Sequence, residues 1–285
     1  MQRRTAHPLI GPRLSPAGGV AIEGIDLSQP MSVAMTAEVV AAFRDHHILV
    51  FRNQTLSREQ QFAFATHFGE VERSKARNAA NKRHAVAHII SNVGEDGRPV
   101  DRSSSPVSNY NWHTDKPYHR APPMMTTLHA VEMPPQGGDT EFANMSLAYS
   151  RLEPEVRHRI AGLRVVFYWG APRRAEESPF PGSDIREAVD HPLVRTHPDT
   201  GAKALYLGNH SSHILGWPLA AGRALLDELL AHATQPEFVY VHRWCIGDLV
   251  MWDNRCLLHR AVANFDMKQH RRVLYRTVVR GTAPF

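Results

Sequence analysis

Short apolar runs separated by glycine, proline and polar turns fill this 285-residue chain from residue 126 onward. They are rich in β-branched and aromatic residues, which is typical of strands. The runs lie at residues 126–131, 140–142, 164–169, 203–207, 237–244, 248–252 and 272–279. They do not alternate regularly with long helical patterns, so a parallel sheet built of βαβ units is not indicated. The spacing predicts a mainly β fold with flanking helices, either a β-sandwich or a jelly roll.

Helical patterns are few: two precede these runs, and the others lie between them. Residues 36–46 carry apolar side chains on one side, and a second helix starts at Ser57, which forms a capping box with Gln60 and ends before Gly69. Ser146 is the expected N-cap of a later helix, and Pro154 is expected at the first position of another. Leucines at helical spacing predict one more helix over residues 219–233.

The chain shows no internal repeat and no low-complexity tract, so residues 1–285 are predicted to form one domain. Two polar segments interrupt the pattern. Residues 73–111 contain charges, Asn, Ser and Gly around one short apolar run at 88–90, and we expect a loop or lid there. Residues 171–191 are polar and proline-rich, and we expect an insertion.

Charge and cysteine content exclude several classes of protein. The net charge is only +5, and the Lys and Arg residues are scattered, so neither a nucleic-acid nor a membrane partner is predicted. The sequence lacks any run approaching the ~20 apolar residues of a membrane helix. With 2 cysteines, a reducing compartment is favoured, and we expect a cytoplasmic protein. The 18 histidines raise the question of a metal site.

One His-x-Asp pattern stands out among these histidines. His113 and Asp115 follow the polar region, and alternation at a strand end places both side chains on the same side. His259 is a candidate third ligand. Two imidazoles and one carboxylate on one face of a metal leave three positions open, as in the non-haem Fe(II) oxygenases. A distant third histidine is easily found among 18, so spacing alone leaves this interpretation open.

Other histidine patterns favour simpler interpretations. The segment containing His197 and Asp199 has the composition of a turn, and we expect a structural role on a surface loop. His210 and His213 have no carboxylate neighbour in the sequence, which favours local polar contacts or pocket walls. His46 and the residue after it end a helix, where imidazole meets exposed carbonyl groups favourably.

The C-terminal run offers a separate indication of a binding site. Alternation places Arg272 and Arg276 on one face, about 13 Å apart. A guanidinium that points into a barrel is costly to bury unless an anion meets it, so these arginines could hold two anions. Two solvent-facing arginines on an edge strand are the alternative.

A series of motifs along the chain resembles those of a known family. This is the taurine dioxygenase and 2,4-dichlorophenoxyacetate dioxygenase family of Fe(II)- and 2-oxoglutarate-dependent oxygenases. The resemblance covers nearly the whole chain. In order, the motifs are Gly-Val-Ala-Ile-Glu-Gly-Ile-Asp-Leu, Ile-Leu-Val-Phe-Arg, His-Phe-Gly-Glu, Trp-His-Thr-Asp, Pro-Pro-Gln-Gly-Gly-Asp-Thr-Glu-Phe, Leu-Val-Arg-Thr-His-Pro, Trp-Asp-Asn-Arg and Arg-Arg-Val-Leu-Tyr-Arg.

The resemblance implies a double-stranded β-helix of the cupin-like jelly-roll type and a role for each of several residues. It implies that Fe(II) is held by His113, Asp115 and His259, and that the distal carboxylate of 2-oxoglutarate is bound by Thr140 and Arg272. It places the acidic group of the substrate at Arg276, with Asn109 on the substrate side and Trp252 as a wall of the metal pocket. The implied activity consumes O2, releases succinate and CO2, and hydroxylates a small anionic substrate. Family members are often dimers or tetramers, so a homo-oligomer is expected.

The substrate is less well defined by the resemblance. His-Thr-Asp is similar to the taurine enzymes, whereas the segments around Trp244 and Trp252 are closer to the phenoxyacetate enzymes. The taurine enzymes contact substrate through a His and a Tyr where this chain has Ser74 and Arg77. An aryloxyalkanoate-like carboxylate with ether cleavage is therefore favoured, and a sulfonate releasing sulfite is the alternative.

Three other classes remain for comparison. A nucleic-acid-modifying oxygenase would need an extended positive groove with stacking aromatic residues. An anion-binding protein without turnover would not need an intact metal triad. A zinc hydrolase would need a general base near the metal and would have no use for Arg272.

Overall fold

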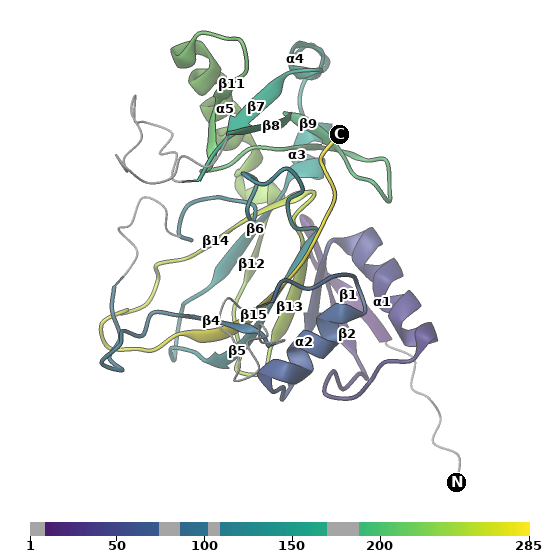
Figure 1. Cartoon of the computed structure of the whole chain (residues 1–285), viewed down its shortest axis with the longest axis vertical. Coiled ribbons are helices and arrows are strands. Elements are labelled where there is room, and N and C mark those ends of the chain that lie inside the picture. The colour runs from purple at the N-terminus through teal and green to yellow at the C-terminus, as the bar shows by residue number, and fades with distance from the viewer. Residues whose placement is uncertain (1–8, 74–85, 102–108, 170–187) are drawn as a thin grey trace.

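Two facing β-sheets form the centre of the computed structural model, which describes residues 9–73, 86–101, 109–169 and 188–285 (Figure 1). The strands of the larger sheet are Leu9–Ser15 (β1), Gly18–Glu23 (β2), Ile48–Phe51 (β3), His88–Ser91 (β4), Met125–Glu132 (β5), Leu249–Asp253 (β13) and Val273–Val279 (β15). They lie in the order β1-β2-β3-β13-β5-β15-β4. All neighbouring pairs are antiparallel except β2 and β3.

The smaller sheet faces the β13-β5-β15-β4 half of the larger one. Its strands are Thr140–Asn144 (β6), Val239–His242 (β12) and Leu257–Ala261 (β14). Their order is β12-β6-β14, so neighbours in this sheet come from distant parts of the chain. Two antiparallel sheets joined by such crossovers form a double-stranded β-helix, the jelly roll predicted from the sequence.

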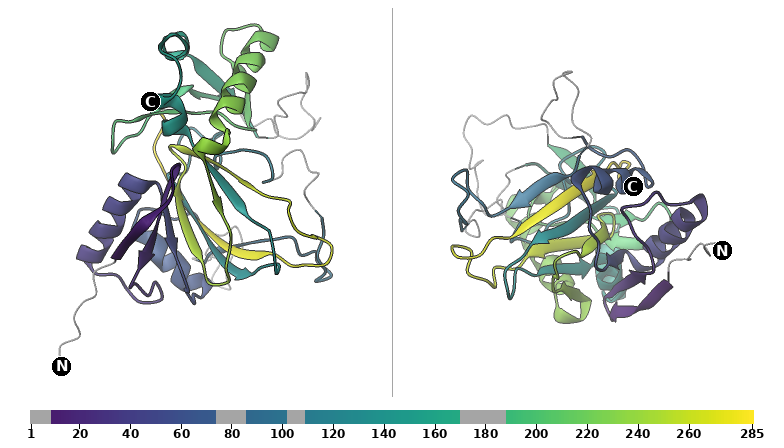
Figure 2. Two further views of the ribbon diagram at one scale, coloured as in Figure 1. Left: turned by 180° about the vertical axis from the view of Figure 1, so that it is seen from behind. Right: turned by 90° about the horizontal axis from the view of Figure 1, so that it is seen from below.

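A layer of short strands and helices covers one end of the two sheets (Figures 1 and 2). Its elements are Met145–Ser150 (α3), Pro154–Ile160 (α4), Arg164–Phe167 (β7), Val189–Pro192 (β8), Val194–Thr196 (β9), Lys203–Leu205 (β10), Ser211–Ile214 (β11), Leu219–Ala233 (α5) and the 3-10 helix Pro236–Phe238. The buried face of α5 carries Leu225, Leu226 and Leu229 at helical spacing, and it joins the same core as the inner faces of the two sheets.

Two further helices, Val33–His46 (α1) and Arg58–Thr66 (α2), pack against the other face of the larger sheet (Figure 2). This is why every residue of β3 is buried. Alternation along β3 sends Leu49 and Phe51 toward these helices, and sends Ile48 and Val50 into the core between the sheets. The larger sheet therefore separates two apolar cores.

Several boundaries differ from the predictions. The N-cap of α3 is Asn144 and not Ser146, because the Asn144 side chain accepts the hydrogen bond from the Leu147 amide at 2.9 Å. The predicted strand at 237–244 begins as a 3-10 helix and is regular only over β12. The residues between the strands predicted at 248–252 and 272–279 contain a further strand, β14, which the apolar pattern does not indicate.

The two polar segments are only partly described. Within residues 73–111, the expected loop contains β4, which pairs with β15, while 74–85 and 102–108 lie outside the described residues. Most of the expected insertion, 170–187, also lies outside them, and β8 occupies its last residues. Among the described residues, none of the helices is long and apolar enough to cross a membrane.

Candidate active site

Two distant histidines are brought together by the backbone. His113 and His259 form an isolated antiparallel bridge: the His113 amide donates to the His259 carbonyl at 3.0 Å, and the His259 amide donates to the His113 carbonyl at 2.8 Å. Residues paired in this way point their side chains to the same face of the sheet. The two imidazole centroids are consequently 4.1 Å apart. The sheet itself fixes the spacing of the two rings.

Asp115 completes a buried cluster with these histidines. The three residues each offer a ligand atom within 4.8 Å of the others. Burial lowers the pKa of His259 to about 3, and also lowers that of His113, so both rings are neutral at pH 7. Burial alone would raise the pKa of Asp115, but His259, Arg276 and His113 nearby and a hydrogen bond from Thr126 hold it well below its usual range.

The donor set of this cluster matches Fe(II). The Nδ1 atom of His113 lies 2.8 Å from the Asn111 carbonyl, which can only accept, so the proton is on Nδ1 and the Nε2 lone pair is left for another partner. The Nδ1 atom of His259 is buried and has no hydrogen-bond partner in the described part of the chain. Two neutral imidazoles and one carboxylate are the ligands of the 2-His-1-carboxylate class of iron sites.

Arg272 and Thr140 lie side by side at the back of the same pocket. Arg272 Nη2 donates to Thr140 Oγ1 at 3.2 Å, and Arg272 Nε donates to the Gly138 carbonyl at 2.8 Å. Trp244 Nε1 also donates to Thr140 Oγ1, at 3.0 Å. Burial lowers the pKa of Arg272 to about 10, so the guanidinium stays charged at pH 7. Its remaining N–H groups suit a carboxylate.

Arg276 lies next to the cluster formed by His113, Asp115 and His259. Its Nη1 atom is 3.8 Å from Asp115 Oδ1, and its buried Nε has no partner in the described chain. Both arginines line the pocket, as alternation along the strand predicted. The pocket encloses about 410 Å³, including the part that opens to solvent. Its lining residues are Ile90, Asn109, His113, Asp115, Leu128, Thr140, Trp252, His259, Ala261, Arg272 and Arg276.

All seven candidate residues from the sequence therefore meet in one pocket, together with Trp252. Asn109 is exposed, and its carbonyl accepts a hydrogen bond from the Ala261 amide, so it stands at the rim. His210 packs edge-on against Tyr118 with ring centroids 5.0 Å apart. Ser74 and Arg77 lie outside the described residues.

Sequence reasoning did not single out two buried residues behind Asp115. Thr126 Oγ1 donates to Asp115 Oδ2, and Asn254 Nδ2 donates to Thr126 Oγ1 at 2.9 Å. A signal was present: alternation along the strand predicted at 126–131 places Thr126 on the same face as Leu128. Threonine is common in strands, however, so its presence there does not by itself indicate a role beside a metal ligand.

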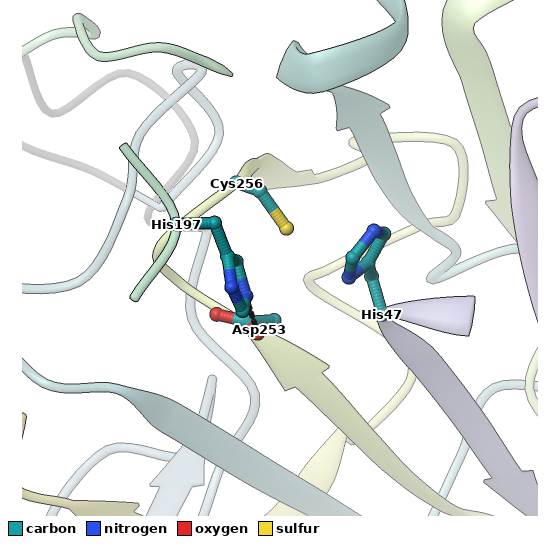
Figure 3. A group of neighbouring side chains, drawn as sticks. All are labelled: His47, His197, Asp253 and Cys256. Carbon is teal, nitrogen blue, oxygen red and sulfur yellow. Dashed lines mark hydrogen bonds and ion pairs between the residues drawn. The ribbon is translucent and has the colours of Figure 1, made fainter. Parts of the chain in front are cut away.

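A second group of donor atoms lies away from the pocket and consists of His47, His197, Asp253 and Cys256 (Figure 3). The predicted surface position of His197 is wrong, since only 1% of this residue is exposed. Its Nδ1 atom accepts from the Asp199 amide, so its Nε2 atom carries the proton and donates to Asp253 Oδ2 at 2.9 Å.

Asp253 is also held by a cation. Arg255 Nε donates to Asp253 Oδ1 at 2.8 Å, and Arg255 Nη2 donates to Asp253 Oδ2 at 2.7 Å. Both carboxylate oxygens are thus engaged by protein donors. This geometry supports a structural role for the second group, which we call the Asp253 network.

The fold and the pocket together define a class of protein. A jelly roll that encloses a buried His-x-Asp and a distant His, backed by an arginine on the last strand, has the architecture of the Fe(II)- and 2-oxoglutarate-dependent oxygenases.

Comparisons with known proteins identify the family. The model of the taurine catabolism dioxygenase TauD, TfdA family matches residues 11–278. The chain is 40% identical to the alpha-ketoglutarate-dependent 2,4-dichlorophenoxyacetate dioxygenase of Cupriavidus pinatubonensis, over 93% of this chain and 96% of the relative. It is 33% identical to the (S)-phenoxypropionate/alpha-ketoglutarate-dioxygenase of Sphingobium herbicidovorans, over 92% of each chain.

A solved structure agrees with these sequences. AAD-2 in complex with Mn(II) and N-oxalylglycine superimposes with a TM-score of 0.87 at 35% identity, covering 98% of both chains. The chain belongs to the TauD/TfdA family, and it is an Fe(II)- and 2-oxoglutarate-dependent dioxygenase.

Proposed function

We propose that His113, Asp115 and His259 hold Fe(II), that Thr140 and Arg272 hold the distal carboxylate of 2-oxoglutarate, and that Arg276 and Asn109 bind the substrate. The observation that carries this proposal is the convergence of all seven residues on one pocket. The chemistry supplied by bound Fe(II) is activation of O2, coupled to decarboxylation of 2-oxoglutarate to succinate and CO2 and to hydroxylation of a substrate carbon.

The residues of this chain bind and orient the reactants. The neutral imidazoles of His113 and His259 offer lone pairs without first losing a proton, and Asp115 adds one negative charge. Arg272 is fixed by Gly138 and Thr140, so it can meet a carboxylate with little loss of side-chain freedom. Burial of the pocket strengthens each of these charge interactions.

We infer that the substrate is a small aryloxyalkanoate. Arg276 supplies a guanidinium for the carboxylate, and its unpartnered Nε supports an anion at this position. Ile90, Leu128 and Ala261 provide apolar walls suited to an aromatic ring. The names of the two relatives, which act on 2,4-dichlorophenoxyacetate and (S)-phenoxypropionate, support the same class.

Ether cleavage follows from hydroxylation of the carbon beside the ether oxygen. The new hydroxyl makes that carbon a hemiacetal, whose C–O bond to the aryl oxygen breaks while the hydroxyl proton moves to the leaving phenol. An aryloxyacetate would thus give a phenol and glyoxylate, together with succinate and CO2. A sulfonate handled in the same way would release sulfite, and the taurine branch of the family makes this the second candidate.

A succinate-release screen tests the substrate class. We expect aryloxyalkanoates to raise succinate formation above the substrate-free level, with release of one phenol per succinate. The corresponding aryloxyethanols, which keep the ring and ether but lack the carboxylate, serve as matched controls and should give little stimulation. Stimulation by sulfonates or sulfate esters, with none by aryloxyalkanoates, would contradict the assignment.

Replacing Arg276 with leucine should uncouple the reaction. Leucine is shorter and offers no donor to the substrate anion, so we expect less phenol for each succinate formed. Loss of a charged hydrogen-bond partner typically costs about 2 to 5 kcal/mol, so the KM for the aryloxyalkanoate should rise by more than about tenfold. The measurement is the ratio of phenol to succinate. An unchanged ratio and KM would show that the anion is bound elsewhere.

We also propose the setting in which the enzyme works. We propose one catalytic domain over residues 1–285, with a lid or loop region at about 73–111 and an insertion at about 171–191. We propose a cytoplasmic homo-oligomer, a dimer or tetramer, that acts on a small molecule and has neither a nucleic-acid nor a membrane partner. Scattered charge and 2 cysteines in the sequence support this setting.

A further inference from the structure

A continuous line of hydrogen bonds runs behind the metal cluster and ends on Asp115. Trp252 Nε1 donates to Asn254 Oδ1 at 3.0 Å, Asn254 Nδ2 donates to Thr126 Oγ1 at 2.9 Å, and Thr126 Oγ1 donates to Asp115 Oδ2 at 2.5 Å. All four side chains are buried. We call Trp252, Asn254 and Thr126 the carboxylate relay.

The direction of each bond in the relay is fixed by chemistry. An indole N–H can only donate, so the oxygen of the Asn254 amide must face Trp252 and its nitrogen must face Thr126. The Thr126 oxygen therefore accepts from Asn254, and its single proton is left for Asp115. An ionised carboxylate can only accept hydrogen bonds. This assignment of donors and acceptors is therefore the one in which every bond of the series has a donor facing an acceptor.

The relay joins the two sheets of the jelly roll. Thr126 lies on β5 and Trp252 on β13, and these residues are paired in the larger sheet. Asp115 comes shortly after His113, whose bridge to His259 attaches it to the smaller sheet. Thr114 Oγ1 also donates to the Asn254 carbonyl at 2.9 Å. The position of the carboxylate is therefore defined from both sheets.

We propose that Thr126 and Asn254 are positioning residues that hold the Asp115 carboxylate in the orientation the metal requires. Oδ2 is engaged by Thr126, whereas Oδ1 lies 3.8 Å from Arg276 Nη1 and accepts no hydrogen bond from the described residues, which leaves it to meet the metal. Without the Thr126 donor the carboxylate would lose this orientation, so its affinity for the metal should fall.

Substitution of Thr126 tests this inference, which rests on the proposed metal centre. Thr126→Val keeps the shape of the side chain and removes its donor, and we expect the dissociation constant for Mn(II) to rise by about 10- to 100-fold. Thr126→Ser restores the hydroxyl and should return the constant to near the wild-type value. Thr126→Cys, with a weaker donor, should fall between them and is a second reduced-donor variant if the valine variant does not fold.

The neighbouring residue provides a matched control. Thr127 is on the same strand, is equally buried, and bonds to Gln61 and Thr277 on the opposite face. Thr127→Val should lower stability without changing the Mn(II) dissociation constant. The constant can be measured by EPR of free Mn(II) in the absence of 2-oxoglutarate, so the readout does not depend on turnover.

The outcomes separate this inference from the proposed function. Weaker Mn(II) binding in Thr126→Val and Thr126→Cys, with rescue by serine and none of this loss in Thr127→Val, supports the relay. Equal Mn(II) binding by the wild-type protein and Thr126→Val would contradict the inference about the carboxylate relay. The same holds if Thr127→Val loses as much affinity as Thr126→Val. Neither result would contradict the proposed metal centre. If the wild-type protein itself does not bind Mn(II), both proposals are overturned.

Discussion

Replacing His113 with alanine is expected to abolish metal binding and 2-oxoglutarate decarboxylation together. The substitution removes one of three proposed ligands and leaves His259 and Asp115 with an incomplete coordination shell. We expect the Mn(II) dissociation constant to rise by more than about 100-fold, the most that loss of a hydrogen-bond partner behind a ligand typically costs. Succinate formation with Fe(II) should fall to the level without enzyme.

A buried histidine outside the pocket controls for loss of packing. His129 lies on β5, and its Nε2 atom is 3.0 Å from the Gln54 carbonyl. His129→Ala should lower stability and leave Mn(II) binding and succinate formation per folded molecule unchanged. Full decarboxylation by His113→Ala, in protein whose folding matches the control, would remove His113 from the metal site.

Asp253→Asn is expected to cause the largest loss of stability. Asp253 is fully buried and accepts from both Arg255 and His197, so the substitution leaves the guanidinium without its counter-charge. Breaking a buried ion pair typically costs about 3 to 5 kcal/mol. At roughly 2 to 4 °C per kcal/mol for a chain of this size, Tm should fall by at least about 6 °C.

A matched substitution removes the outer partner of the same arginine. Asp199 also meets Arg255, at 2.6 Å, but its side chain is 49% exposed. Asp199→Asn should therefore cost less than about 1 kcal/mol. The free energy of unfolding of both variants can be measured by chemical unfolding. Equal losses would contradict the expectation that burial makes the Arg255–Asp253 pair contribute more stability than the Arg255–Asp199 pair.

Acidification should reveal the same interaction. Burial alone would raise the pKa of Asp253, but hydrogen bonds from His197 and Arg255 outweigh it and hold that pKa below its usual range. A carboxyl group whose pKa is lowered by folding stabilises the folded state at pH values above its ordinary pKa of about 4. This stabilisation is lost as the pH falls from that value toward the pKa of the folded state. The difference in unfolding free energy between wild type and Asp253→Asn should therefore narrow below about pH 4.

The strands that the sequence predicted are those that carry their own apolar pattern. β5, β13 and the C-terminal β15 are rich in apolar and β-branched residues, and they lie next to one another in the larger sheet. β14 reads Leu-Leu-His-Arg-Ala, which has no alternation, and it is a strand because it pairs with β6. β11, with the sequence Ser-Ser-His-Ile, likewise depends on pairing with β7. Pairing with a strand that is distant in the sequence gives a short strand such as β11 or β14 no recognisable residue pattern of its own.

The site was predicted to the extent that its residues carry distinctive chemistry. Histidine, aspartate and arginine at characteristic spacings pointed to the pocket, and the series of motifs assigned each of them a role. Thr126 and Asn254 were missed because their importance lies in which atoms they face, and that depends on the pairing of β5 with β13. His197 was misplaced because its turn-like neighbours hid its contact with Asp253.

The backbone bridge between His113 and His259 has a consequence for folding. The two residues are far apart in the chain, so neither hairpins nor single helices can bring their rings together before the smaller sheet has closed. Contacts of high sequence separation slow folding, because the entropy of loop closure is lost before such contacts contribute stability. Metal will then bind the finished fold and not the unfolded chain, so rising metal concentration stabilises the native state by mass action. Metal uptake during refolding would report the moment at which the smaller sheet closes.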